Sequence, residues 1–240
     1  MEVHARIRAG SREIECGLAT TRRERAAVLA QRFRVYQRKG YYRDELRADR
    51  DHWDRKALCF LALLRDKENG DVLLGSARLI VGDSVPGFKF PTEENFELEL
   101  PAAIRATAVS ERAEVSRVVA EATRGVVIGG LLTPLGLLQA MAGYARPRGV
   151  RCGLAGIKQR LLRALQSAGV CLHQIEPVKL LAPEDSPMAG YFYRHRDPVI
   201  PTYYLTDEIV PSIERAIARY QDTNTEPPFG SSSRAQTADP

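Results

Sequence analysis

The chain has 240 residues, of which 44% are hydrophobic and 27% charged, and its formal net charge is +5. These values are ordinary for a globular protein, and no apolar run approaches the roughly 20 residues that a membrane-spanning helix needs. The first residues are charged throughout and lack the apolar centre of a signal peptide, so we expect a cytoplasmic protein. Neither the four cysteines nor the four histidines show metal-ligand spacing, so we expect buried thiols and no bound metal.

The first quarter of the chain predicts a strand, a basic helix and a loop. Residues 12–19 are typical of a short strand, and Thr21 with Glu24 makes a capping box before the next element. Apolar residues then recur at spacings of three and four, which predicts an amphipathic helix over residues 22–38. Its many arginines can attract an acidic protein, a nucleic acid or an acidic membrane surface, or can form a solvated face. The charged residues 41–56 predict an irregular loop with one helical turn at most.

The middle of the chain predicts a β-hairpin and a long polar connection. Apolar runs at residues 57–65 and 71–81 flank a polar turn with an Asn-Gly pair, which is a strong hairpin signal. Residues 82–112 are polar and contain prolines, and we expect a short helix near residues 99–107. Residues 122–132 are rich in glycine, and we expect this segment to be mobile.

The stretch AEVSRVVAE, residues 113–121, predicts a strand whose centre carries charged groups that a sheet core usually excludes. Strict alternation places three of its residues on each face. One face is then expected to hold Val115, Arg117 and Val119, and the other Glu114, Ser116 and Val118. Partners for these charges must come from elsewhere in the chain.

The C-terminal half predicts alternating helices and strands. Thr133 and Pro134 begin a helix well, as an N-cap followed by proline at the first position. A strand, a helix and a second strand are then expected at residues 149–157, 158–169 and 170–178, and a last helix at 207–220. This order predicts one α/β domain with a mixed sheet over residues 1–221. Residues 222–240 have almost nothing to bury, which predicts a disordered tail.

Three places in the sequence combine arginines and carboxylates within apolar surroundings. The charged members are Arg32, Arg78 and Arg117 against Asp51, Asp54 and Glu114. Three charges of each sign can neutralise one another in a shared cleft, and arginine suits this because its planar fork pairs carboxylates in a bidentate manner. The alternative is a set of separate surface ion pairs, each worth at most about 1 kcal/mol.

The order of these motifs resembles that of the acyl-homoserine-lactone (autoinducer) synthases and the N-acyl amino acid synthases, a branch of the GCN5-related N-acyltransferase (GNAT) superfamily. Four motifs carry the resemblance: R-x-x-V-aromatic from Arg32 to Tyr36, D-x-x-D from Asp51 to Asp54, G-x-x-R-L from Gly75 to Leu79, and E-x-S-R from Glu114 to Arg117. The stretches RFRVYQRKGYY and IKQRLLRALQSAGV resemble the N-acyl amino acid synthases more closely, including the acyltransferases that accompany exosortase systems.

The resemblance implies a GNAT-like fold, with a mixed, mostly antiparallel central sheet that is flanked by helices and splayed near its middle. It also implies transfer of a fatty acyl group from a thioester to the amine of a small amino-acid-like acceptor, with no permanently bound cofactor. The superfamily's pyrophosphate-binding loop, Arg/Gln-x-x-Gly-x-Gly/Ala, is not present in that form, which favours an acyl-phosphopantetheine donor on acyl carrier protein over acyl-CoA. An aromatic residue expected after Arg117 is also missing.

Roles for individual residues follow from the resemblance. Glu114, Ser116 and Arg117 are the catalytic candidates. We expect Glu114 to act through a water molecule or by ordering the cleft, because Arg117 should lower its pKa. The backbone around Val118 and Val119 is expected to bind the pantetheine arm as an added half-strand. Arg32 and Tyr36 on the first helix are expected at the acceptor site, and Trp53 is expected to form a wall of it. Arg78 and Arg117 are expected either to bind the acceptor's carboxylate or to close the cluster with Asp51 and Asp54.

Two alternative functions stay open. One is an acyl-homoserine-lactone synthase that uses S-adenosylmethionine, and the mass of the product separates it from a synthase of linear N-acyl amino acids. The other is a non-catalytic module that binds a carrier protein or a nucleic acid. The modest charge and the lack of a recognition-helix signature argue against nucleic acid, so we expect the basic first helix to bind an acidic acyl carrier protein.

Overall fold

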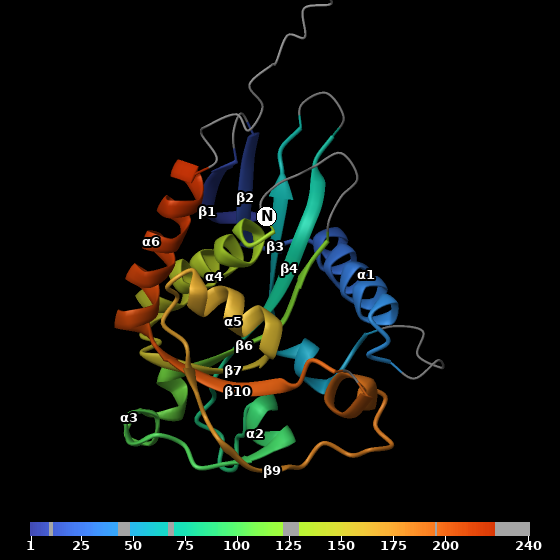
Figure 1. Ribbon diagram of the computed structural model, residues 1–240, viewed down its shortest axis with the longest axis vertical. Coiled ribbons are helices and arrows are strands. Elements are labelled where there is room, and N and C mark those ends of the chain that lie inside the picture. The colour runs from blue at the N-terminus through green and yellow to red at the C-terminus, as the bar shows by residue number, and fades with distance from the viewer. Residues whose placement is uncertain (10–11, 43–48, 67–69, 122–129, 195, 224–240) are drawn as a thin grey trace, which may run out of the picture.

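The structure is a computed structural model, and it describes residues 1–9, 12–42, 49–66, 70–121, 130–194 and 196–223. Among these residues, eight strands form one sheet in the order β1-β2-β3-β4-β6-β7-β10-β8, and β5 pairs with β9 in a second sheet (Figure 1). The strands are β1 (Glu2–Ala9), β2 (Arg12–Leu18), β3 (Leu58–Leu64), β4 (Val72–Val81), β5 (Phe96–Leu98), β6 (Arg112–Ala120), β7 (Cys152–Lys158), β8 (His173–Gln174), β9 (Pro177–Leu180) and β10 (Val199–Leu205).

Helices cover both faces of the large sheet (Figure 1). Leu61 of β3 packs under Val28 of α1, whereas its neighbour Phe60 belongs to the main core with α4, so the two helices lie on opposite faces. The α-helices are α1 (Arg22–Arg38), α2 (Pro91–Asn95), α3 (Ala102–Arg105), α4 (Leu132–Ala145), α5 (Gln159–Ser167) and α6 (Thr206–Thr223). Shorter helical turns are η1 (His52–Arg55), η2 (Val109–Glu111), η3 (Arg146–Arg148) and η4 (Gly190–Arg194). The predicted capping box of Thr21 and Glu24 at the start of α1 is confirmed.

The large sheet opens at its middle, between β6 and β7. All neighbouring strands pair antiparallel except these two, which run parallel and pair over only three residues, Arg112–Glu114 against Cys152–Leu154. Beyond Glu114, β6 continues to Ala120 and β7 to Lys158 without further pairing between them. The predicted mixed, mostly antiparallel sheet with a splayed middle is therefore confirmed.

Two strands of the large sheet were not predicted from the sequence. β1 is an edge strand that buries Ala5 and Ile7 on one face only, so its composition is charged overall and conceals the alternation. β10 contains Pro201, which usually argues against a strand, but its outer side meets only two residues of β8. The strand predicted over residues 170–178 is wrong in extent, because this segment contains only β8 and the first residues of β9.

Two predictions fall on segments that the structure leaves largely undescribed. Of the expected tail, residues 222 and 223 end α6, and residues 224–240 lie outside the described residues. Most of the glycine-rich segment, residues 122–129, lies outside them as well. Within the described residues, no helix combines the length and the apolar character that are needed to cross a lipid bilayer.

Candidate functional site

A β-bulge in β6 determines which way the central charged residues point. Ser116 pairs with Arg78 of β4 and Val119 pairs with Ser76, so three steps along β6 match two steps along β4. Arg117 is the extra residue, and its φ of 56° is the left-handed conformation that non-glycine residues rarely adopt.

The bulge makes the predicted alternation wrong beyond Ser116. Arg117 shares a face with Glu114 and Ser116, because its guanidinium reaches aspartates on the α1 side of the sheet. Val119 packs on that same side with Val35 and Tyr36 of α1. Val118 instead packs against the main core, on the side of Val115. One inserted residue thus gathers the polar groups of β6 on one face.

Six charged side chains on this face form one buried group, the arginine–aspartate cluster: Arg32, Arg78, Arg117, Asp49, Asp51 and Asp54. Arg32 binds Asp54 in a bidentate manner, with N···O distances of 3.0 and 2.7 Å. Asp51 bridges the other two arginines, 2.6 Å from Arg78 and 3.0 Å from Arg117. Asp49 pairs with Arg32 and lies 3.6 Å from Arg117. The three arginines and three aspartates of the cluster therefore neutralise one another.

The turn η1 holds two members of the arginine–aspartate cluster in place. Asp51 accepts a hydrogen bond from the backbone N–H of Trp53 (3.0 Å), and Asp54 accepts one from the backbone N–H of Asp51 (3.0 Å). The D-x-x-D motif is therefore a capping box as well as a pair of ion-pair partners. Burial alone would raise the pKa of Asp51, but the positive charges of Arg78 and Arg117 outweigh it and hold that pKa well below its usual range.

Glu114 lies outside the arginine–aspartate cluster, which corrects the predicted set of six. Asp49 takes its place, and Glu114 Oε2 instead accepts a hydrogen bond from the backbone N–H of Thr92 in α2 (2.9 Å). The side chain is 2% exposed, and burial raises its pKa to about 8 against the opposing effects of the Thr92 N–H and of Arg78. The expectation that Arg117 lowers this pKa is wrong, because Arg117 is engaged by Asp51 and Asp49.

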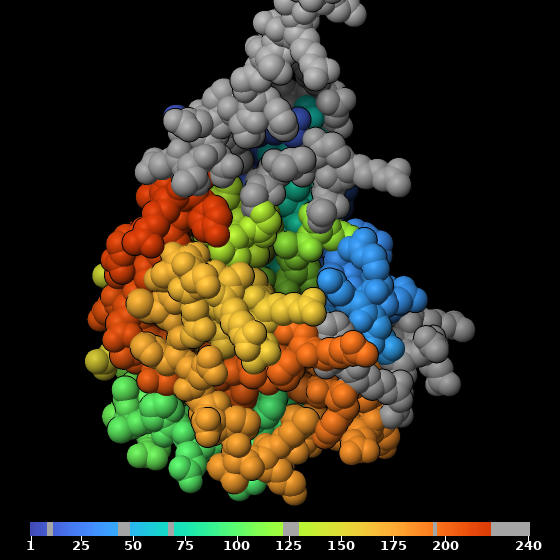
Figure 2. Space-filling view, in the orientation of Figure 1, coloured from blue at the N-terminus to red at the C-terminus, as the bar shows by residue number. Residues whose placement is uncertain are grey.

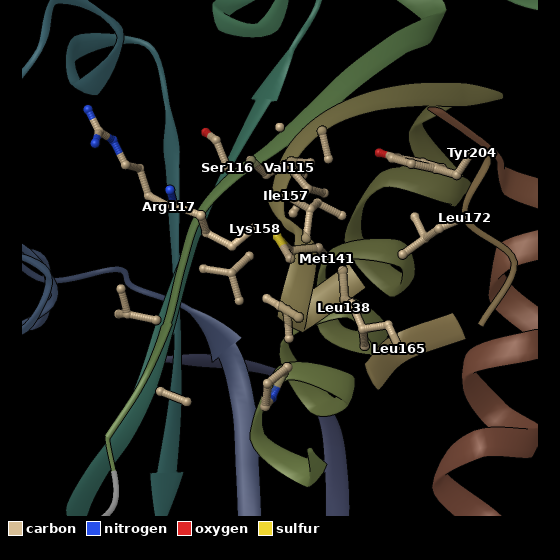
Figure 3. A pocket seen from close by; sticks show the side chains of 18 of the residues that line it. Val115, Ser116, Arg117, Leu138, Met141, Ile157, Lys158, Leu165, Leu172 and Tyr204 are labelled. Carbon is tan, nitrogen blue, oxygen red and sulfur yellow. The ribbon is translucent and has the colours of Figure 1, made fainter. Parts of the chain in front are cut away.

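Two cavities lie beside the bulge and differ in chemical character. The apolar cavity, of about 400 Å³, lies between the separated strands and α4, α5 and α6, and Leu138, Met141 and Leu165 line it (Figure 3). In Figure 3, Ser116 and Arg117 extend from β6 away from these apolar side chains. Figure 2 shows a hollow between α5 (yellow) and α1 (blue), with green atoms of β6 at its base.

The polar cavity, of about 440 Å³, lies on the other side of β6 and is lined by Asp51, Trp53, Arg78, Thr92 and Glu114 among others. The two cavities share five lining residues at the bulge: Tyr36, Ser116, Arg117, Gly156 and Tyr191. Groups bound in the two cavities can therefore meet beside Ser116 and Arg117.

The other predicted site residues line these cavities. Ser116 Oγ accepts a hydrogen bond from Arg78 Nε (3.0 Å), and Trp53 Nε1 donates one to Glu94 (2.8 Å). Tyr36 lies with its ring 5.5 Å from the Arg117 guanidinium, and Val118 and Val119 line the apolar cavity. Of the two open roles for Arg78 and Arg117, the observed contacts correspond to closing the cluster with Asp51 and Asp54.

Sequence reasoning missed Asp49 and Thr92. Asp49 lies two residues before Asp51, the first residue of the D-x-x-D motif. The sequence feature that could have pointed to it is a second aspartate next to Arg50. Thr92 follows Pro91 at the start of α2, a Pro-initiated helix in the segment 82–112, where the sequence predicts a helix only near residues 99–107. Within the described part of the chain, no group of histidine, cysteine and carboxylate side chains is arranged to hold a metal ion.

Three solved structures with the same fold align with this chain over nearly their whole length. TofI, solved in a ternary complex with an inhibitor and MTA, has a TM-score of 0.56 at 19% identity, covering 84% of this chain and 98% of TofI. MesI, a CoA-dependent acyl-homoserine lactone synthase, has a TM-score of 0.51 at 14% identity (85% and 95% covered). FeeM, an N-acyl amino acid synthase from uncultured soil microbes, has a TM-score of 0.50 at 18% identity (82% and 94% covered).

These structures confirm the predicted fold class. The chain has the GNAT-like fold of the acyl-homoserine lactone synthases and of an N-acyl amino acid synthase, the two groups that its motifs resemble. No family model matches the sequence, and a search of curated proteins finds no match either.

Proposed function

We propose that the protein is an N-acyltransferase that moves a fatty acyl group from a thioester donor to the amine of an amino-acid-like acceptor. One observation carries this proposal: an apolar and a polar cavity meet at a bulged strand, next to a buried carboxylate whose pKa is raised to about 8. An apolar cavity suits an acyl chain, whereas a polar cavity with a few placed groups suits a small acceptor.

The donor fits the gap between β6 and β7. The acyl chain occupies the apolar cavity, where burial of each methylene group contributes about 0.8 kcal/mol. Among the described residues, β6 does not pair with β7 beyond Glu114, so its backbone around Arg117, Val118 and Val119 can hydrogen-bond the amide groups of a pantetheine arm as an added half-strand. The thioester then lies at the bulge, where both cavities meet.

Glu114 is the candidate general base. An amine attacks only as the free base, and a carboxylate with a pKa of about 8 can accept its proton near neutral pH. Glu114 lines the polar cavity, where the acceptor amine would lie, and backbone N–H groups of the bulge are the candidates to stabilise the oxyanion. The arginine–aspartate cluster forms one wall of that cavity, and its ion pairs connect α1, η1 and β6.

The donor's carrier is proposed to be an acyl carrier protein. Arg22, Arg23 and Arg25 of α1 are exposed, and the exposed Lys39 and Arg160 flank the apolar cavity, so an acidic partner meets positive charge there. MesI, by contrast, is described as CoA-dependent, so acyl-CoA is the alternative donor that the test has to include.

The proposal is tested by the products that the protein makes. The purified protein is given acyl carrier protein or CoA thioesters, each with the twenty standard amino acids and S-adenosylmethionine, and products are identified by mass spectrometry. We expect a linear N-acyl amino acid from the wild type and none from Glu114→Gln. An N-acyl homoserine lactone would instead support the second candidate function, which the fold shared with MesI favours. Absence of any acylated product from all combinations would overturn both.

A further inference from the structure

Lys158 is a buried lysine at the splayed end of β7. Its side chain is 8% exposed, and it lines the apolar cavity (Figure 3). Its Nζ donates hydrogen bonds to the backbone carbonyls of Tyr191 (2.5 Å) and Asp197 (2.7 Å), and lies 4.9 Å and 4.4 Å from the ring centroids of Tyr41 and Tyr191. A lysine has three N–H donors, so these two carbonyls leave one N–H for another acceptor.

The tyrosines place Lys158 near the bulge. Tyr191 stacks on Tyr36, with ring centroids 5.8 Å apart, and Tyr36 lies beside the guanidinium of Arg117. Lys158 and Arg117 therefore approach one pair of stacked rings, Lys158 from β7 and Arg117 from β6. Both tyrosines of this pair line the two cavities where they join. The lysine thus lies on the donor's side of the junction, while Glu114 lies on the acceptor's side.

Acyl transfer from a thioester releases a thiolate, which needs a proton or a positive charge in a cleft with little water. An alkyl thiol has a pKa of about 8.5, so its thiolate leaves faster when an acid of similar pKa protonates it. Burial lowers the pKa of Lys158 to about 8, with a smaller opposing effect from Asp197. The ammonium form and the thiolate are therefore matched for proton transfer.

We propose that Lys158 is a catalytic residue that donates a proton to the departing thiolate; this inference rests on the proposed acyl transfer. The amine nitrogen attacks the thioester carbon, the C–N bond forms, and Glu114 takes the amine's proton. The oxyanion then collapses, the C–S bond breaks, and the sulfur takes a proton from Lys158 Nζ. Glu114 loses its proton and Lys158 regains one through solvent, so the net change moves one proton from nitrogen to sulfur.

A purely structural role predicts different behaviour. The two carbonyl contacts tether the segment that includes η4 and Asp197 to β7, and loss of this tether would slow transfer from every donor alike. A proton donor matters only for a thiolate that leaves with difficulty. Donors that differ in the acidity of the released thiol therefore separate the two roles.

The experiment compares Lys158→Met with the wild type on two decanoyl thioesters, one of N-acetylcysteamine, an alkyl thiol, and one of the more acidic thiophenol. The acceptors are the twenty standard amino acids, and released thiol is measured. We expect Lys158→Met to lower kcat with the alkyl thioester by about 10²-fold or more, to change it little with the thiophenyl thioester, and to remove the fall in rate above about pH 8.

A second variant separates proton donation from charge. Lys158→Arg keeps the positive charge but does not release a proton near pH 8, so we expect it to remain slow with the alkyl thioester. Equal losses with both donors, full activity of Lys158→Met with the alkyl thioester, or full rescue by arginine would overturn the assignment. If the wild type transfers from neither thioester nor from carrier-bound or CoA-bound donors, the proposed function fails and this inference with it.

Discussion

At the scale of single residues, the notable feature is Glu114, a buried carboxylate that forms no ion pair with the described residues although a group of paired charges lies close by. The three arginines of the cluster are neutralised by Asp49, Asp51 and Asp54, so none of them forms an ion pair with Glu114 among the described residues. Burial then dominates and favours the neutral acid. Because Asp49 rather than Glu114 completes the cluster, Glu114 keeps the raised pKa that its proposed role as a general base requires.

Glu114→Gln should nearly abolish transfer without unfolding the protein. We expect kcat/KM to fall by about 10²- to 10⁴-fold, the usual contribution of a general base. In the wild type, kcat/KM should rise with pH towards about 8 as the carboxylate ionises. Steady-state rates between about pH 6 and pH 9 measure both effects, and Glu97→Gln, at an exposed position of β5, is the control that should retain full activity.

The same residue should give the protein a pH-dependent stability. The folded-state pKa of Glu114 is above the unfolded value, so its stabilising contribution is complete below the unfolded pKa of 4.5 and is lost as the pH rises through about 8. Glu114→Gln cannot ionise, so its unfolding free energy should decline less over this range. Urea unfolding of both proteins at several pH values measures the difference, and identical slopes would contradict a raised pKa.

Asp54→Asn should destabilise the protein strongly, because it leaves Arg32 with a single carboxylate partner in a buried site. Removal of one member of a buried ion pair costs about 3–5 kcal/mol. Asp71→Asn is the matched control, since Asp71 pairs with Arg65 where both side chains are about 40% exposed, and such pairs contribute at most about 1 kcal/mol. Urea unfolding at neutral pH measures both variants, and similar losses would show that the cluster is not stabilising.

The sequence indicated five of the six members of the arginine–aspartate cluster and missed Asp49. The motifs that resemble those of the synthases identified four members without difficulty: Arg32, Arg78, Asp51 and Asp54. The side on which Arg117 lies was not predictable from alternation, because a bulge with an arginine in the left-handed conformation has no sequence signal comparable to glycine. Asp49 was missed because its role depends on the path of the chain before η1, which composition alone does not determine.

At the scale of elements, the short pairing of β6 with β7 creates the site. Strands joined by a helix usually pair along their length, but these two diverge after three residues, and α4 and α5 pack where they separate. β1 and β10 show why the rest of the sheet was harder to predict. An edge strand with one buried face has too few apolar residues, and a strand with proline contradicts the usual propensity.

α6 should set the length of the acyl chain. Ile213 lines the apolar cavity, whereas Ile217, one turn later, packs in the core outside it. Ile213→Phe and Ile217→Phe add similar bulk, and overpacking costs about 1–3 kcal/mol at either position. We expect only Ile213→Phe to shift the product distribution towards shorter acyl chains, as measured by mass spectrometry of products from a mixture of donors. The same shift in both variants would mean that the cavity does not hold the chain.

At the scale of the whole molecule, the proposed donor and acceptor sites lie on different sides of β6. Residues of α4, α5, α6 and the end of α1 line the apolar cavity, whereas η1, α2 and η4 contribute to the polar cavity, so in the proposed reaction the two substrates meet at the bulge. The order of the motifs predicted the mixed sheet with its splayed middle, but not the two cavities beside it. In the proposed reaction, a carrier-bound donor reaches the bulge through the hollow between α1 and α5 (Figure 2).

Charge reversal on α1 should therefore slow a donor that arrives on an acidic carrier. Among the described residues, Arg22, Arg23 and Arg25 form no ion pair, whereas Arg34 and Arg38 are held by Glu121 at 3.1 and 3.0 Å. We expect the triple variant with glutamate at these three positions to lower kcat/KM for acyl carrier protein thioesters, most strongly at low salt, because screening weakens exposed charges beyond about 10 Å at 0.1 M. Acyl-pantetheine, which carries no protein, should be used equally well by the variant and the wild type.

A control variant carries the same change in net charge outside α1: Arg146→Glu, Arg151→Glu and Arg215→Glu, all at exposed positions. Long-range attraction by net charge alone predicts equal slowing of both triple variants, whereas docking on α1 predicts slowing of the first alone. α1 has 17 residues and is about 25 Å long, so its arginine-rich start lies well away from the cavity residue Lys39 at its end. An effect of the first triple variant on acyl carrier protein only would therefore mean that the carrier contacts the whole length of α1 while its arm enters beside Lys39.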